Sequence, residues 1–155
     1  VHDTYELRYI DVIMGFGVFS RVNIKQGDFI GIYCGTQTHV KEKNLHYSFS
    51  FTNNIKKKPS KTYIHALLSG NITRFVNHAP DKTNKSHRLL SANLKATQHQ
   101  LQGLTCIAFQ ATENISPGEQ LLIDYGQIYF NKNNKINWFR KNYQNFLSQI
   151  KKVTQ

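Results

Sequence analysis

Two short stretches, far apart in the sequence, carry side chains whose types and spacing are suited to chemistry. Arg74–His78 (RFVNH) places an amide and an imidazole next to an apolar pair. Gly118–Gly126 (GEQLLIDYG) is a glycine turn, a short apolar run and then a single phenol, Tyr125, before a second glycine. Neither stretch has the Cys/His spacing of a metal site or the parts of a Ser-His-Asp set. They therefore argue against a zinc centre and against a serine hydrolase.

A third stretch, Gly15–Gly17 (GFG), could let the backbone approach a cofactor where a Cβ would clash. Ser20 stands where a dinucleotide-binding fingerprint would have its third glycine, and residues 21–28 read as strand and turn rather than helix. A Rossmann fingerprint needs a strand, the glycines and then a helix, so that interpretation fails. Taken alone, the two glycines are equally well explained as a bare turn.

Length and composition predict one folded domain. The 155 residues can bury a proper core, and 39% hydrophobic residues with ten Phe and eight Tyr are typical of a globular protein. No apolar run approaches the roughly 20 residues that a membrane span needs, so we expect no membrane segment. Because the chain starts at Val1 and contains only Met14, we expect it to be a piece of a longer protein.

Charge and cysteine content limit the partners and the compartment. A net charge of +11 attracts nucleic acid or acidic surfaces at low salt. The run Lys56–Lys58 is explained either by a solvated loop, which we favour, or by a DNA contact. We predict that Cys34 and Cys106 are buried thiols in a reducing compartment, with a disulfide as the alternative.

The elements that must position these residues are mostly short strands. Alternation and apolar runs predict strands at residues 5–13, 29–35, 47–51, 63–66, 104–111 and 121–123. Residues 38–46 read as a short helix or a loop, and residues 79–95 as mostly loop. In the tail, apolar residues at steps of three and four predict an amphipathic helix from about 135 to 152. The predicted fold class is a mainly β domain with a C-terminal helix, which packs on this domain or docks to whatever follows.

In their order and spacing these motifs resemble those of SET-domain protein lysine methyltransferases. Gly15–Phe19 looks like the family's GxG segment, and Lys25–Ile30 like the strand that follows it. Gly70–His78 is close to "GNxxRFxNH", and Ile115–Gly126 is similar to "I-x-x-GEEL-x-x-DYG". The resemblance covers roughly residues 8–126. It implies small β-sheets wound around a pseudoknot, with the SET domain at residues 1–126 and a helical segment at 127–155 that closes the site without zinc.

The resemblance also implies a division of roles among the aromatic residues. Tyr125 becomes the central phenol, where the amine, the transferable methyl group and the sulfur meet; without the motif it would read as a tyrosine ending a buried strand. Tyr47 corresponds to a second catalytic aromatic. Tyr33, Ile123 and Phe51 correspond to the walls of the substrate channel, although Phe51 could equally be plain core.

The cofactor implied by the family is S-adenosylmethionine. Gly15, Phe16 and Gly17 correspond to its glycine segment, and Asn77 and His78 to the pair that holds it. By the same resemblance, Arg74 is a structural or cofactor-proximal cation. In the tail, Trp138 is the first candidate for stacking on adenine and Phe130 the second, with plain packing of the Trp as the alternative.

Several positions depart from the family pattern. Ala79–Lys82 replaces the usual Ser-Cys-x-Pro-Asn after the Asn-His pair, and the cysteine-rich zinc segment is absent. Ile123 stands where Phe or Tyr is common, and without a hydroxyl to hold a water it favours transfer of more than one methyl group. His65 stands where the family usually has Asp, which we interpret as a local substitution without catalytic meaning.

The function implied is methyl transfer to a lysine ε-amine of a protein, with histone tails the first candidate and a nuclear, chromatin location following from it. A dry aromatic channel beside a sulfonium would lower the lysine pKa from about 10.4, which predicts a rate that rises with pH. We expect a monomer with a non-specific contact to DNA or nucleosomes. The alternatives are a non-histone substrate or a catalytically inactive SET-like interaction module.

Overall fold

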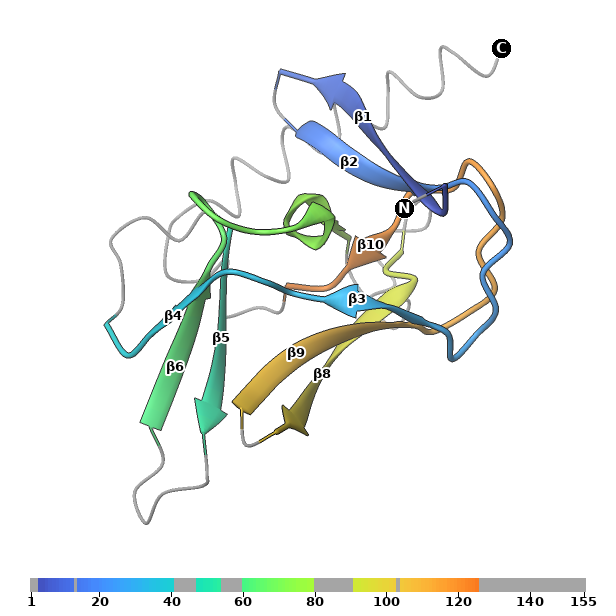
Figure 1. Cartoon of the computed structure of the whole chain (residues 1–155). Helices are drawn as coiled ribbons and strands as arrows, with labels where there is room; N and C mark the ends of the chain where they lie inside the picture. The colour runs from blue at the N-terminus through green and yellow to red at the C-terminus, as the bar shows by residue number, and fades with distance from the viewer. Residues whose placement is uncertain are drawn as a thin grey trace.

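The described part of the chain forms three small antiparallel or mixed sheets, and Figure 1 shows them arranged around a short central helix. The computed structural model describes residues 3–12, 14–40, 47–53, 60–79, 91–102 and 104–125. The 3-10 helix η1 (Ile72–Phe75) lies near the middle of the drawing, between the hairpin and the larger sheet. Segments from distant parts of the sequence therefore meet around η1.

The first sheet is the hairpin of β1 (Tyr5–Asp11) and β2 (Gly15–Ser20). The second has the strand order β3-β9-β8-β10-β7, in which β3 is Phe29–Ile32, β9 is Leu104–Ala111 and β8 is Leu94–Leu101. The third has the order β4-β6-β5, with its strands at Thr36–Thr38, Ser60–His65 and Ser48–Asn53.

The two shortest strands join two distant parts of the sequence. Strand β7 (Asn77–His78) and strand β10 (Leu122–Ile123) pair in parallel, with Asn77 beside Leu122 and His78 beside Ile123. The two stretches that carry the predicted chemistry are thus adjacent backbone segments. Two paired residues supply little free energy by themselves, so the crossing depends on the core beneath it.

A single hydrophobic core joins the sheets. The largest fully buried side chains come from β2, β6, β9, β10 and the turns beside them: Val18, Ile64, Phe109, Ile115, Leu121 and Ile123. Burying each such side chain contributes about 1.5–3 kcal/mol. Among the described residues, none forms a helix long and apolar enough to cross a membrane.

Most predicted strands are present, although several bounds differ. The prediction at 29–35 ends early because the chain leaves β9 after Tyr33, whose N–H donates to Ile107 O at 2.8 Å. The loop predicted at 79–95 is wrong at its end, since β8 begins at Leu94 and pairs with β9 along its whole length. The strands β2, β4 and β7 and the helix η1 were not predicted, and the glycine stretch taken as a possible bare turn begins β2. The helix predicted at 135–152 lies outside the described residues.

The prediction of two buried thiols is also wrong. Cys34 is exposed and Cys106 is half-buried, and both are free. Each follows or precedes a residue whose side chain points into the core, Tyr33 and Ile107 respectively. Because neighbouring side chains of extended backbone point to opposite faces, the two thiols are directed away from the core.

Candidate active site

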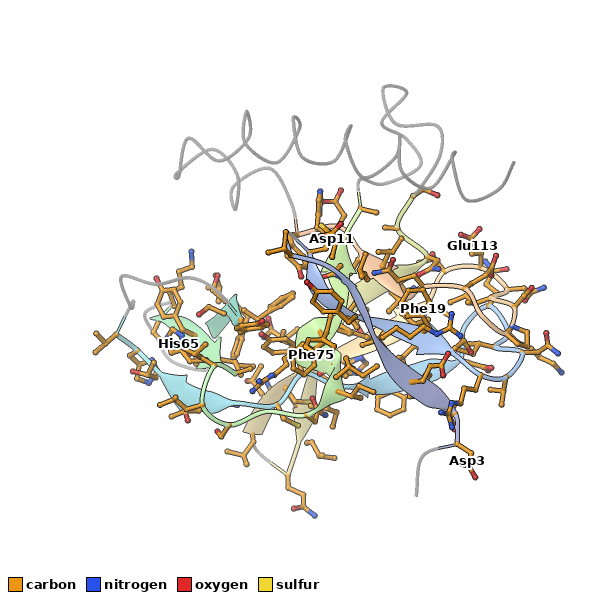
Figure 2. The ribbon with its side chains drawn as sticks, turned by 90° about the horizontal axis from the view of Figure 1, so that it is seen from above. Asp3, Asp11, Phe19, His65, Phe75 and Glu113 are labelled. Carbon is orange, nitrogen blue, oxygen red and sulfur yellow. The ribbon has the colours of Figure 1, made fainter. Side chains whose placement is uncertain are left out.

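Five consecutive residues, Arg74 to His78, contact Phe16, Tyr47 and Tyr125, three of the predicted site residues. They run from the end of η1 through Val76 into β7. In Figure 2 Phe75 lies in the middle of the molecule, between the part that carries His65 and the hairpin that carries Phe19. The side chains of this segment point in both directions from that central position.

On one side, the segment holds Tyr125. The Tyr125 hydroxyl donates a hydrogen bond to Val76 O at 2.6 Å, and the Tyr125 N–H donates to His78 Nδ1 at 3.0 Å. The rings of His78 and Tyr125 also pack, with centroids 5.3 Å apart. Because Nδ1 accepts a hydrogen bond, His78 acts here as a neutral imidazole. Asp124 Oδ1 lies 3.7 Å from the same nitrogen.

Asn77 connects the segment to the glycine stretch. Its Nδ2 donates to Phe16 O at 3.1 Å. A Cβ added to Gly17 would lie 2.6 Å from Gln120 Nε2 and 3.2 Å from Asn77 Nδ2, so a larger residue there would displace both amides. The space at Gly17 is therefore filled by protein side chains. Gly15, in contrast, has φ +67° with nothing within 4 Å of an added Cβ, which leaves open space beside it.

On the other side, the segment contacts Tyr47. The Arg74 guanidinium lies over the rings of Tyr47, at 5.3 Å, and Phe75, at 4.6 Å. Phe75 packs edge-to-face on Tyr47 at 5.9 Å and on Phe16 at 6.1 Å. Phe16 in turn meets Tyr9 at 5.6 Å. Four aromatic rings thus form a row across the site, and three of them, Tyr9, Phe16 and Tyr47, are exposed.

Arg74 is tied to the backbone as well. Its Nη1 donates to Ala66 O at 2.9 Å and to Leu67 O at 3.2 Å. Within the described part of the chain, its Nε is buried with no hydrogen-bond partner. These contacts fit the expectation of a structural cation beside the site.

The structure places the three predicted channel residues in the core. Tyr33 packs against the rings of Phe49 and Phe109, and Phe51 and Ile123 are buried as well. Ile123 also lines a cavity of about 340 Å³, whose walls include Leu94, Ala96 and Asp124. Trp138 and Phe130 lie outside the described residues. Among the described residues, no group of three His, Cys, Asp or Glu could hold a metal ion.

Two polar residues that lie where β7 and β10 cross were not identified from the sequence. Asn93 is buried; its Oδ1 accepts from Leu122 N at 2.9 Å and its Nδ2 donates to Gln120 O at 2.9 Å, so it substitutes for a strand partner of β10. Gln120 stands at the second Glu of "GEEL", and its buried Nε2 has no partner in the described part of the chain. No local signal indicated Asn93, because the strand that follows it, β8, is mostly polar.

Comparison with known proteins decides the family. The model of the SET domain matches residues 15–126. The chain belongs to the SET domain family. This SET domain is 32% identical to human histone-lysine N-methyltransferase EHMT1 over 124 residues, which cover 79% of this chain and 9% of that protein. It is 28% identical to histone-lysine N-methyltransferase set-1 of Caenorhabditis elegans over 130 residues, 76% of this chain and 49% of that protein. The chain therefore spans less than half the length of either relative.

Proposed function

We propose that this SET domain transfers a methyl group from S-adenosylmethionine to the ε-amine of a lysine in a protein. One observation carries the proposal: the five residues Arg74–His78 contact Phe16, Tyr47 and Tyr125, which come from three separate parts of the sequence. The printed names of the relatives, both histone-lysine N-methyltransferases, support the same chemistry.

The residues around Gly15–Gly17 fit the methyl donor. Gly15 has open space beside it, the Phe16 ring is 45% exposed, and the buried Gln120 Nε2 is a donor with no acceptor among the residues that the structure describes. A buried, unmatched N–H costs about 1–3 kcal/mol, which a ligand oxygen would recover. We assign the glycine stretch, Asn77 and His78 to holding the donor. By resemblance, Trp138 stacks on its adenine and residues 127–155 close the site.

Transfer needs orientation and a neutral amine rather than a metal or a covalent intermediate. When bound, S-adenosylmethionine supplies a methyl group on a positively charged sulfur. Tyr125 commits its hydroxyl hydrogen to Val76 O, so the phenolic oxygen presents lone pairs to an incoming amine. As the amine attacks, the N–C bond forms, the C–S bond breaks and the amine proton leaves to water. Holding the reacting atoms in line is the main contribution of the protein.

The environment of the amine also favours its neutral form. The Arg74 guanidinium over Tyr47 and the sulfonium are both cations, and like charges lower the pKa of a lysine ammonium. The rate should therefore rise with pH until the bound lysine is deprotonated. Ile123 offers no hydroxyl, and we propose that this SET domain adds more than one methyl group, with Tyr33, Phe51 and Ile123 supporting the channel from the core.

The test is methyl incorporation. Recombinant protein is incubated with S-adenosylmethionine and either histone octamers or a mixture of cellular proteins. It should add methyl groups to lysines, and mass spectrometry should detect each one as an increase of about 14 Da, the mass of the added CH₂. EDTA should leave the rate unchanged. Absence of lysine methylation from every protein pool, in a preparation that is folded, would contradict the proposal.

We propose histones as the first substrate and a nuclear, chromatin location for the protein, because both relatives are named for histone lysines. A non-histone substrate is the alternative outcome of the same experiment. Methylation that occurs only in the cellular protein mixture would identify a non-histone substrate.

A contact with DNA is favoured by the distribution of charge. Of the 20 Lys/Arg and nine Asp/Glu in the chain, the described residues contain six Lys/Arg and seven Asp/Glu. The basic excess thus belongs to the rest of the sequence, which includes Lys56–Lys58 and the tail 126–155 with six Lys/Arg and no acidic residue. We propose that the basic excess gives a non-specific contact with nucleosomal DNA. DNA affinity should then fall steeply with salt. Neutralising Lys56, Lys57 and Lys58 should leave the slope of log K against log salt unchanged if the run is the solvated loop that we favour, and should reduce the slope if it contacts DNA.

A further inference from the structure

His65 occupies a position that the sequence comparison left without a role. It ends β6 directly opposite Ser48, the first residue of β5. Its side chain is 7% exposed, and its Nδ1 lies 2.7 Å from Ser48 Oγ, within hydrogen-bond distance. The Tyr63 ring stacks on the imidazole with an interplanar angle of 8°. The imidazole is therefore held in one orientation, with Nδ1 directed at the serine.

Ser48 directly follows Tyr47, whose backbone is unusual. Tyr47 has φ +56°, a left-handed conformation that bulky residues adopt only when their surroundings impose it. The Ala66 N–H donates to Tyr47 O at 2.8 Å, and the Ala66 carbonyl accepts from Arg74, whose guanidinium covers the Tyr47 ring. Ala66 thus binds the carbonyl of the Tyr47–Ser48 peptide bond, and His65 binds the side chain of the residue that follows Tyr47.

We propose that His65 is a positioning residue: its hydrogen bond to Ser48 fixes Tyr47 in the left-handed conformation that directs the phenol ring onto Arg74 and Phe75. The inference rests on the proposed function in so far as Tyr47 contacts the substrate. It assigns a purpose to the imidazole where the family pattern has a carboxylate. An imidazole nitrogen can donate to or accept from the Ser48 hydroxyl, whereas an ionised carboxylate only accepts.

The experiment first measures the NMR signal of the Tyr47 ring and then measures methyl-transfer activity. The chain has eight tyrosines, so ring ¹³C labelling gives a simple spectrum in which Tyr47→Phe identifies the Tyr47 signal. His65→Leu removes the hydrogen bond at similar volume, and His65→Asn restores a polar atom near the position of Nδ1. Ser48→Ala removes the bond from the other side. Ser50→Ala, at an exposed position on the same strand, is the matched control.

We expect His65→Leu and Ser48→Ala to shift or broaden the Tyr47 signal and to lower kcat by roughly tenfold, with KM for S-adenosylmethionine unchanged. The double variant should lose no more than either single one, because the two residues act through one bond. His65→Asn and Ser50→Ala should resemble the wild type in both measurements.

Two results would overturn the proposal. One is a Tyr47 signal that stays in its wild-type position in a folded His65→Leu protein. The other is a double variant whose loss of kcat is the product of the two single losses. If the wild type transfers no methyl group but the Tyr47 signal still responds to His65→Leu and recovers in His65→Asn, the positioning role stands and the proposed function fails.

Discussion

The two tyrosines of the site are held in different ways by the same five residues. Tyr125 is fixed by hydrogen bonds from its hydroxyl and its amide, at 2.6 and 3.0 Å, to residues of the central crossing. Tyr47 is 39% exposed and is held by ring contacts to Arg74 and Phe75 and by one backbone hydrogen bond to Ala66. Hydrogen bonds specify direction, whereas ring contacts tolerate small rotations.

This difference suggests a division of labour. On the Tyr125 side, the hydrogen bonds of Tyr125 set the position of its phenolic oxygen. On the Tyr47 side, the ring contacts of Tyr47 with Arg74 and Phe75 form an adjustable wall that faces solvent. A change on the first side should therefore act mainly on kcat through geometry, and a change on the second side should have smaller effects. Each prediction below tests one side against the other.

The largest effect is expected for Tyr125→Phe. It removes the oxygen that we propose orients the reacting groups, and we expect kcat to fall by about 10²–10³-fold, as for loss of a single preorganised polar group in other enzymes. Val76 O loses its partner, which costs about 1–3 kcal/mol of stability. Methyl-transfer kinetics and thermal unfolding measure the two effects. Tyr5→Phe, a change at another phenol on β1, is the control and should leave kcat unchanged.

Asn77→Ala should have the next largest effect, on binding. The amide joins β7 to Phe16 O, so its loss removes both a ligand contact and the anchor of the glycine stretch. We expect the affinity for S-adenosylmethionine to fall by roughly tenfold, since one hydrogen bond is worth about 1 kcal/mol or somewhat more. Calorimetric titration gives the value, and an unchanged Kd would separate Asn77 from the cofactor.

These predictions depend on contacts between residues that could be predicted only in part from the sequence. Alternation placed the strands at Ser48–Asn53 and Leu104–Ala111, because each has one buried face. It missed β8, where Lys95, Gln98 and His99 leave little apolar pattern and the strand is specified by its register against β9. Leu94 and Lys95 were assigned to a loop for the same reason, although they begin this strand.

The site shows a similar limit. The motifs identified Tyr125, Asn77, His78 and Phe16 by their order along the chain, and the structure joins them through hydrogen bonds. The roles of Asn93 and of His65 depend on partners 17 or more residues away, Leu122 and Ser48. No spacing rule predicts which residues face each other across two strands whose turn is of unknown length.

Arg74→Lys tests the adjustable side. A lysine ammonium cannot cover two rings and reach the Ala66 and Leu67 carbonyls in the same planar manner, so Tyr47 should lose part of its support. We expect kcat to fall by only about threefold to tenfold, less than for Tyr125→Phe, with stability lower by about 1 kcal/mol. A loss as large as that of Tyr125→Phe would remove the distinction between the two sides.

The smallest effect is expected at Tyr5, remote from both tyrosines of the site. Burial, and then the charge of Asp28, raises the pKa of the Tyr5 phenol, whose hydroxyl donates to Ile30 O. A raised folded-state pKa means that this stabilisation is complete below about pH 10, the unfolded value, and is lost as the pH rises through the folded value. Tyr5→Phe should unfold with a weaker alkaline pH dependence and unchanged kcat. Denaturant unfolding between neutral and alkaline pH measures it.

The most direct test of the central claim is an experimental structure with S-adenosylhomocysteine, the demethylated form of the donor. The account predicts that it lies along Gly15–Gly17, contacts Asn77, and directs its sulfur toward the Tyr125 hydroxyl. Binding in the cavity lined by Leu94 and Ala96, with Asn77 and Tyr125 out of contact, would contradict it.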